Sequence, residues 1–344
     1  MQGKGQVQKM NSISRRTLLA GSASIAAISS LTGIPSFAAV NKDPKTGTTP
    51  YSPNAGIYRH TLGSAELYSI TDGSNSFPRR DNFVLNASPQ VVASELTNNF
   101  LDPDTITLTF TPVLLKTKGQ TVVIDTGLGE NAFQQSKGIG GQFHRNLSAA
   151  GFSTKQIDKV LITHFHADHI GGLITADNKP AFPDSQIYVP AAEYAFWMSD
   201  SNMKNAATEG IKTNFERARH IFGIIGTNLH KFEPDEEVAP GVTSIATPGH
   251  TPGHSSFIIS SENHTAIVQG DVTTHPALFI RHPEWHGWSD MDPDLAEKTR
   301  RQLYDRIVKD KILLQGFHFS FPSMGHVVKP DDGYQFVPLM WDPS

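Results

Sequence analysis

The sequence predicts an α/β fold in which two mixed β-sheets pack as an αβ/βα sandwich with helices on the outer faces. Short β-rich runs alternate with helical runs, and the strands come in two batches, each followed by helices. The 344 residues are 38% apolar, which suffices for the core of one large domain or two small ones. The composition excludes a disordered, collagen-like or coiled-coil protein.

The first batch of strands is marked by alternating and continuous apolar runs. Lys118-Gly119 separates two such runs and predicts the turn of a hairpin. The run 160–162 is short and wholly apolar, as in a buried strand. The predicted elements of this half are strands over 66–71, 105–117, 121–124 and 160–162 and a helix over 144–150 that Gly151 closes.

The second half contains the clearest helix, over 292–309. Asp292 can cap this helix, Pro293 suits its first turn, and core-facing side chains recur every four residues from Leu295 to Ile307. The turn Glu262-Asn263 joins two β-rich runs into a second hairpin. The other predicted elements are helices over 191–198 and 214–225 and strands over 256–260, 265–269 and 312–314.

The beginning of the chain resembles a twin-arginine export signal. Arg15-Arg16 precede a weakly apolar stretch, and Ser36 and Ala38 are the small residues that a signal peptidase needs. A membrane anchor or a disordered tail is the alternative, but Gly and Ser residues interrupt the apolar stretch. We therefore expect a periplasmic or secreted protein. The expected segments are a signal over 1–38, a flexible lead-in over 39–60 and a folded domain over 61–344.

The net charge of the chain after the predicted signal indicates which kinds of partner the protein can bind. Four of the 29 basic residues and none of the 33 acidic residues lie within the first 38, so the remainder carries eight more acidic than basic residues. An acidic protein lacks the basic face that binds phosphates, which disfavours nucleic acid as a partner. No later segment is apolar for long enough to span a bilayer. We expect a small-molecule substrate.

The chain has 15 histidines and no cysteine, so any metal must be held by His, Asp or Glu. His164, His166, Asp168 and His169 lie within six residues, directly after the predicted strand 160–162. An extended backbone would point His164 and His166 to the same side, and the next two ligands can face a second position as the chain turns. A polar turn or an adventitious metal binder is the alternative, but four unpaired polar groups after a buried strand are costly.

Three further candidate ligands also follow predicted strands. His250 lies in a loop rich in Pro and Gly, Asp271 follows the strand 265–269, and His318 follows the strand 312–314. Rigid strand ends can hold ligands to within tenths of an ångström. Carboxylates such as Asp271 are the groups best able to bridge two cations.

The pattern His-x-His-x-Asp-His, with the later His250, Asp271 and His318, resembles the signature of the metallo-β-lactamase superfamily. The resemblance covers roughly 67–338. Within the superfamily the chain is most similar to the methyl parathion hydrolase group, and the related quorum-quenching lactonases share the metal motif. The segments that carry this closer resemblance are 124–127, 182–183, 195–197, 250–254, 321–326 and 333–338.

The resemblance implies two divalent metal ions. The implied ligands are His164, His166 and His250 for the first ion and Asp168, His169 and His318 for the second, with Asp271 bridging both. This donor set suits zinc, and manganese, iron and cobalt remain open. The resemblance also implies that Asp125 hydrogen-bonds the metal loop, while His254 is expected to play a supporting part.

The activity that follows is hydrolysis by a hydroxide shared between the two metals, with Asp168 and Asp271 as the catalytic carboxylates. The bond would be a neutral ester, a lactone or an organophosphate triester. A metal protein of the same fold with redox chemistry on oxygen or sulfur substrates is the alternative, and a non-catalytic binding module is a third.

The resemblance places Trp197 and Phe133 in the substrate pocket, with core packing as the alternative for both aromatic side chains. Many quorum-quenching lactonases carry a tyrosine three residues after the bridging aspartate, and this position is Thr274 here. His275 begins an aromatic segment, 275–288, that would line the mouth of the pocket or form the contact of a homodimer.

Overall fold

The computed structural model describes residues 56–340. The predicted export signal and most of the predicted lead-in lie outside these residues. The last part of the lead-in is not loop, because strand β1 begins at Ile57. Within the described range, no helix combines the length and the apolar character that crossing a membrane requires.

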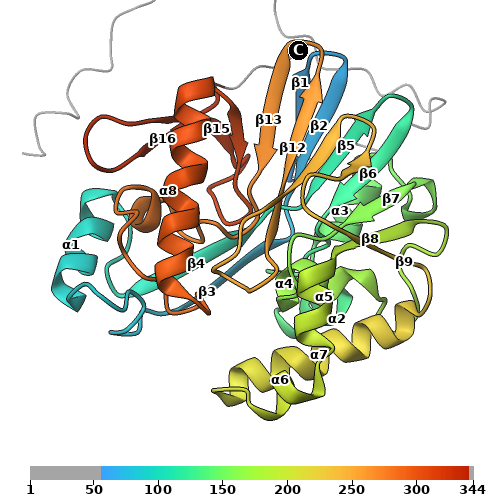
Figure 1. The fold of residues 1–344 in the computed structure, drawn as a ribbon, viewed down its shortest axis with the longest axis horizontal. Helices are drawn as coiled ribbons and strands as arrows, with labels where there is room; N and C mark the ends of the chain where they lie inside the picture. Colours follow the sequence, from blue (N-terminus) through green and yellow to red (C-terminus); the bar gives the residue numbers. More distant parts are fainter. Residues whose placement is uncertain (1–55, 341–344) are drawn as a thin grey trace, which may run out of the picture. The chain divides into compact units, whose positions relative to one another are not determined.

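Two seven-stranded mixed sheets form the body of the fold (Figure 1), which confirms the predicted sandwich. In the first sheet β1, β2, β5 and β6 pair antiparallel and β6 to β9 pair parallel, whereas in the second sheet β13 and β14 are parallel and the other neighbours run antiparallel. The first sheet contains, in spatial order, β1 (Ile57–Leu62), β2 (Ala65–Ile70), β5 (Val113–Thr117), β6 (Gln120–Ile124), β7 (Lys159–Leu161), β8 (Gln186–Pro190) and β9 (Leu229–Phe232). The second contains β10 (Glu237–Ala239), β11 (Val242–Ala246), β12 (Ser255–Ser261), β13 (His264–Val268), β14 (Leu313–Gln315), β15 (Met324–Val328) and β16 (Gln335–Pro338).

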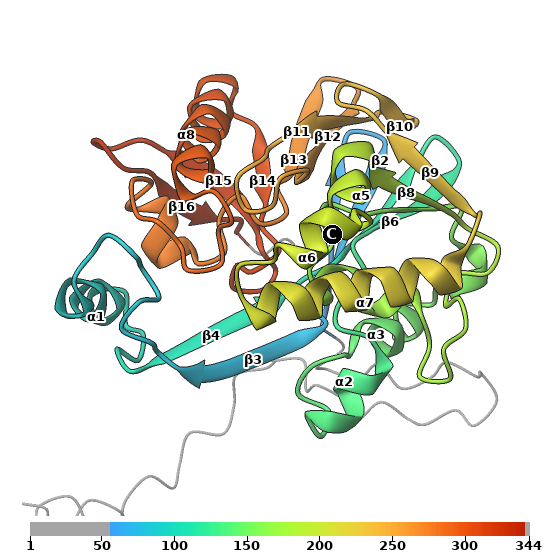
Figure 2. The ribbon, with the colours of Figure 1, turned by 60° about the horizontal axis from the view of Figure 1, so that its bottom comes forward.

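Helices cover the outer faces of the two sheets, as Figure 2 shows for the first sheet. The apolar side chains of α7, among them Phe215 and Phe222, pack with β6, β7 and β8, while Leu303 and Ile307 of α8 pack with β13 and β14. A third core lies between the sheets. The helices are α1 (Pro89–Asn98), α2 (Glu130–Gln135), α3 (Phe143–Ala149), α4 (Ala167–Ile170), α5 (Ala191–Trp197), α6 (Asp200–Lys204), α7 (Glu209–Ile225) and α8 (Pro293–Asp310).

Local sequence signals explain the elements that were predicted well. Lys118 and Gly119 have φ of 43° and 81°, the positive values that a two-residue hairpin turn needs, and they join β5 to β6. The predicted hairpin of β12 and β13 is also present. Helix α8 begins at Pro293, and Asp292 Oδ1 accepts a hydrogen bond of 3.0 Å from the N–H of Leu295.

The predicted strand 105–117 is wrong in one respect, because it is two strands in different sheets. β4 (Thr105–Phe110) pairs with β3 (Gly73–Pro78) in a separate two-stranded arm, whereas β5 belongs to the first sheet. Pro112 lies at the break, where it cannot donate a ladder hydrogen bond. The arm leads to α1, which packs on the π-helical turn Pro276–Ile280. Figures 1 and 2 both show α1 at the far end of this arm.

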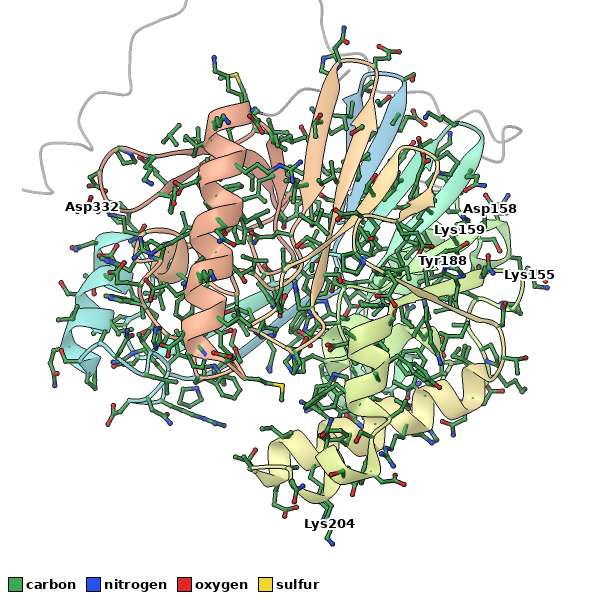
Figure 3. The ribbon with its side chains drawn as sticks, viewed as in Figure 1. Lys155, Asp158, Lys159, Tyr188, Lys204 and Asp332 are labelled. Atoms are coloured by element: carbon green, nitrogen blue, oxygen red, sulfur yellow. The ribbon has the colours of Figure 1, made fainter. Side chains whose placement is uncertain are left out.

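A lysine links the first sheet to the second. Lys159 of β7 and Tyr188 of β8 lie side by side in Figure 3, with Lys159 Nζ 4.6 Å from the centre of the Tyr188 ring. The same Nζ donates a hydrogen bond of 2.8 Å to the carbonyl of Val238 in β10. This contact fixes the first sheet against the edge of the second.

Candidate metal centre

The seven predicted metal ligands are brought together by loops that follow β7, β11, β13 and β14. Within each of two groups the candidate ligand atoms lie within 4.8 Å of one another. Asp271 adjoins both groups, because its Oδ2 lies 3.2 Å from His250 Nε2 and its Oδ1 lies 3.3 Å from His169 Nε2. This is the position that the predicted bridging role requires. The first group contains His164, His166, His250 and Asp271, and the second contains Asp168, His169 and His318.

One short motif serves both groups because the chain changes direction within it. The backbone after β7 is still extended at His166, with φ −69° and ψ 156°, and α4 begins at the next residue. The extended stretch carries His164 and His166 into the first group. Asp168 and His169 lie on the first turn of α4 and reach the second group.

Three of the imidazoles are held in one tautomer by acceptors that cannot donate. Each uses Nδ1 to donate a hydrogen bond, so that its Nε2 carries a lone pair directed into the centre. Such lone pairs are the donors that a cation needs. The three hydrogen bonds run from His169 to Asp125 Oδ2 (2.8 Å), from His250 to Asp290 Oδ1 (2.9 Å) and from His318 to the carbonyl of Thr109 (2.9 Å).

The centre contains buried polar atoms that no protein group satisfies. Both His169 Nε2 and Asp271 Oδ1 are buried without a hydrogen-bond partner. A buried polar group left unsatisfied costs about 1–3 kcal/mol, which a cation between the two atoms would remove. Imidazole and carboxylate donors in this number fit two divalent transition-metal ions. The residues present therefore fit the metals that the sequence implied.

The environment of the centre shifts the pKa values of its imidazoles in opposite directions. Burial lowers the pKa of His164 and His166 well below the usual value. Burial acts in the same direction on His250, but the hydrogen bonds to Asp271 and Asp290 raise the pKa of His250 to about 9. Protons and metal ions compete for such nitrogens, so metal binding is expected to release protons.

His254 lies beside the two groups and is not part of either. Its Nε2 accepts a hydrogen bond of 2.9 Å from the N–H of Asp271, and its Nδ1 lies 2.8 Å from Thr247 Oγ1. Burial lowers the pKa of His254 to about 3, so the ring is neutral. It holds the backbone of Asp271 in place.

Asp125 joins the two central strands beneath the centre. It follows β6 in a left-handed conformation (φ 58°). Its Oδ1 accepts a hydrogen bond of 2.9 Å from the N–H of Thr163, and its Oδ2 accepts one of 2.8 Å from the Thr163 hydroxyl. The bond from His169 to the same Oδ2 makes Asp125 the group that sets the tautomer of a second-group ligand.

We expect Asp125→Asn to weaken metal binding in the second group by about 10- to 100-fold. An amide nitrogen at the position of Oδ2 cannot accept from His169 Nδ1, so the ring would move its proton to Nε2 and lose its ligand lone pair. Zinc affinity measured by chelator competition checks this expectation. Wild-type affinity in the variant would contradict it.

Two buried acidic residues near the centre were not predicted from the sequence. Asp290 contacts His250 and also pairs with Arg300, with 3.3 Å between Oδ2 and Nη2. Glu193 is fully buried in α5. Asp290 carries no sequence signal, because it is a single aspartate in a loop. Glu193 does carry one, since it lies four residues before Trp197 and therefore on the same apolar helix face.

The predicted pocket residues do not come together at one place as the seven predicted ligands do. Trp197 is fully buried and packs on Phe215, with 4.6 Å between ring centres, which fits the core-packing alternative. Phe133 is half-buried on α2 beneath the guanidinium of Arg145. Thr274 is partly exposed. Neither aromatic residue lines the large cavity described next.

A cavity of about 750 Å³ adjoins the second group at His318. It lies between α1, β4, β16 and the π-helical turn, and His275 is in its wall. His275 is 6% exposed, and its Nδ1 has no hydrogen-bond partner. Of the predicted pocket residues, His275 is therefore the one in the wall of this cavity, whose volume suits a small substrate.

Burial lowers the pKa of His275 to about 4, which makes a prediction about stability. In the unfolded chain a histidine binds a proton near pH 6.5, so the unfolded state is favoured as the pH falls from about 6.5 to about 4. The free energy of unfolding therefore decreases over this pH range, and we expect His275→Gln to remove up to about 3 kcal/mol of that decrease. Urea unfolding of the metal-free proteins at pH 7.5 and pH 4.5 measures it, and an identical pH dependence in both would contradict it.

Comparison with known proteins agrees with this geometry. The sequence profile of the metallo-β-lactamase superfamily matches residues 111–311, more than half of the chain. An N-acyl homoserine lactonase from a Bacillus species is 24% identical over 265 residues, which are 69% of this chain and 93% of the lactonase. An N-acyl homoserine lactonase from Bacillus thuringiensis is 26% identical over 218 residues, which are 58% of this chain and 77% of that one.

Two solved structures share the fold. AidC, a dizinc quorum-quenching lactonase in complex with a product, superposes with a TM-score of 0.78 at 25% identity and covers 83% of this chain and 98% of AidC. The hydrolase AbOPH of the β-lactamase superfamily has a TM-score of 0.76 at 24% identity, with the same coverage. Because the family profile, the fold and the ligand motif agree, the chain belongs to the metallo-β-lactamase superfamily.

Proposed function

We propose that the protein is a two-zinc hydrolase whose substrates are lactones, with N-acyl homoserine lactones as the first candidates. The observation that carries this proposal is the pair of adjacent ligand groups with Asp271 between them. The relatives that are named as N-acyl homoserine lactonases support the choice of substrate. An imidazole-rich donor set without thiolates supports zinc.

When bound, two divalent cations supply an acidified water and positive charge for the developing oxyanion. The chain's own contribution is a set of ligands that are oriented in advance. His169, His250 and His318 are each fixed by a hydrogen bond at Nδ1, so no reorganisation is needed during the reaction.

Asp168 is the carboxylate that is open to a substrate. Its side chain is 20% exposed, whereas that of Asp271 is 3% exposed. An acid in this position can take up the proton that the attacking water loses and deliver it to the leaving alkoxide of the lactone. This assigns proton transfer to Asp168 and support of both cations to Asp271.

The cavity beside His318 supports a neutral substrate. Its two long charged side chains already have partners: Glu95 Oε1 accepts a hydrogen bond of 3.0 Å from Asn99 Nδ2, and Arg281 Nη2 donates a hydrogen bond of 2.8 Å to Asp331. Leu101 and Phe336 add apolar surface. A neutral acyl chain matches such a wall better than a charged one.

We also propose that the protein acts in the periplasm or outside the cell. Arg15-Arg16 and the small residues Ser36 and Ala38 support this location. An organophosphate triester is a second candidate substrate, since it is also neutral and can be hydrolysed by a metal-activated water.

Parallel assays with purified, zinc-loaded protein test the proposal. The substrates are N-acyl homoserine lactones, aryl esters and paraoxon-like triesters, with an Asp271→Ala preparation as the control for contaminating hydrolases. We expect ring opening to release one proton per lactone and kcat/KM to be highest for the lactones. Oxygen uptake without hydrolysis would replace the proposal with the redox alternative, and preferred cleavage of triesters would correct the substrate class.

A further inference from the structure

Glu193 is a buried carboxylate outside both ligand groups, and its two oxygens accept four hydrogen bonds. It lies in the first turn of α5 and is inaccessible to solvent. Its Oε1 accepts from the N–H of Phe165 (3.0 Å) and from Trp197 Nε1 (2.7 Å), and its Oε2 accepts from the hydroxyl of Thr251 (2.9 Å) and the N–H of Gly253 (2.9 Å).

Three of these four donors belong to the two loops that carry the three imidazoles of the first ligand group. Phe165 lies between His164 and His166, and Thr251 directly follows His250. One carboxylate therefore joins the loop after β7 to the loop after β11. Residues of the second group, among them His318, donate no hydrogen bond to Glu193 in the described part of the chain.

The fit between α5 and the His250 loop leaves little freedom. A Cβ on Gly253 would lie 2.1 Å from the backbone nitrogen of Glu193, so the loop rests directly on the helix. The ligand nitrogens joined in this way are closely spaced, with 3.0 Å from His164 Nε2 to His166 Nδ1 and 2.9 Å from His166 Nδ1 to His250 Nε2. A small shift of one loop would change the size of the site.

We propose that Glu193 is a positioning residue for the first metal ion, because it fixes the distance between the two loops that supply its three imidazoles. This inference rests on the proposed two-metal centre. Its consequence is selective: losing Glu193 weakens the first ion most, because His169 and His318 of the second group keep their own hydrogen bonds to Asp125 and Thr109.

Glu193→Gln tests the proposal with little change in volume. A glutamine has one acceptor oxygen, so its amide nitrogen must face one pair of donors and at least one loop loses a bond. We expect zinc at the first group to bind about 10- to 100-fold more weakly, as when other groups that orient metal ligands are removed. Chelator competition gives the affinities, and anomalous X-ray scattering from zinc-loaded crystals shows which ion is retained.

Two comparison variants make the result specific. Trp197→Phe removes one donor to Glu193 but neither loop contact, and we expect it to retain both ions at wild-type affinity. Asp125→Asn acts on His169 and should weaken the second ion most, the reverse of Glu193→Gln. If Glu193→Gln does not fold, Thr251→Val removes one loop contact with almost no change in shape and should weaken the first ion in the same direction.

A weak zinc peak at His164, His166 and His250 with a full peak at the second group supports the proposal. Full occupancy of both groups in Glu193→Gln, or an equal loss from both, overturns it. A lower unfolding temperature with unchanged zinc affinities also overturns it, because this would show that Glu193 only stabilises the fold. Wild-type protein that binds no zinc would instead refute the proposed function.

Discussion

Asp271→Ala is expected to abolish tight binding of the second metal ion and to reduce turnover by at least about 100-fold, the loss seen when one preorganised hydrogen-bond donor is removed from other active sites. Asp271 is 3% exposed and adjoins both ligand groups. Without its charge, two cations would repel each other with less compensation. Metal content by mass spectrometry and lactone turnover measure the two effects.

The isosteric variant Asp271→Asn separates charge from shape. It retains one acceptor oxygen but no charge, so we expect it to bind more metal than Asp271→Ala and still to lose most of the activity. Wild-type metal content together with full activity in either variant would refute the assigned position of Asp271 between the ions.

Asp290→Asn is expected to reduce both stability and metal affinity. The change removes the charge partner of Arg300, which is 2% exposed and would remain buried without its anion. Breaking such a buried pair costs about 3–5 kcal/mol of the free energy of unfolding. An amide has one acceptor oxygen, so either Arg300 or His250 loses its acceptor, and His250 in both cases loses the negative charge beside Nδ1. The first metal ion should therefore bind about 10- to 100-fold more weakly.

Asp305→Asn is the matched control for this prediction. Asp305 lies on the same helix as Arg300 and pairs with Lys329, but the two side chains are 56% and 39% exposed. An exposed pair contributes at most about 1 kcal/mol, so the control should unfold almost like the wild type. Urea unfolding of the metal-free proteins makes the comparison. Equal stability of Asp290→Asn and Asp305→Asn would show that the buried pair contributes no more to the free energy of unfolding than the exposed pair.

The parts of the fold that could be predicted are those with local causes. The turn Lys118-Gly119 and the cap at Asp292 are determined by neighbouring residues, and both are present in the structure. The position of the candidate ligands is also partly local, because each follows a strand with a clear apolar pattern. Parallel pairing then brings the ends of β6 and β7, and of β13 and β14, to the same edge.

The parts that could not be predicted depend on contacts between distant segments. The run 105–117 alternates apolar and polar residues; Pro112 marks the break within it, but the assignment of the two halves to different sheets depends on the pairing of β4 with β3. Asp290 and Glu193 act on loops 40 and 28 to 60 residues away, respectively. Trp197 is an aromatic residue of the kind that often lines pockets, but the packing of its helix places its side chain in the hydrophobic core.

The most direct test of the two-metal centre is the metal content and lactone turnover of the purified protein before and after exhaustive chelation. We predict two divalent ions per chain, complete loss of turnover when both are removed, and recovery on addition of two equivalents of zinc. Turnover that persists in protein shown to be free of metal would contradict the account.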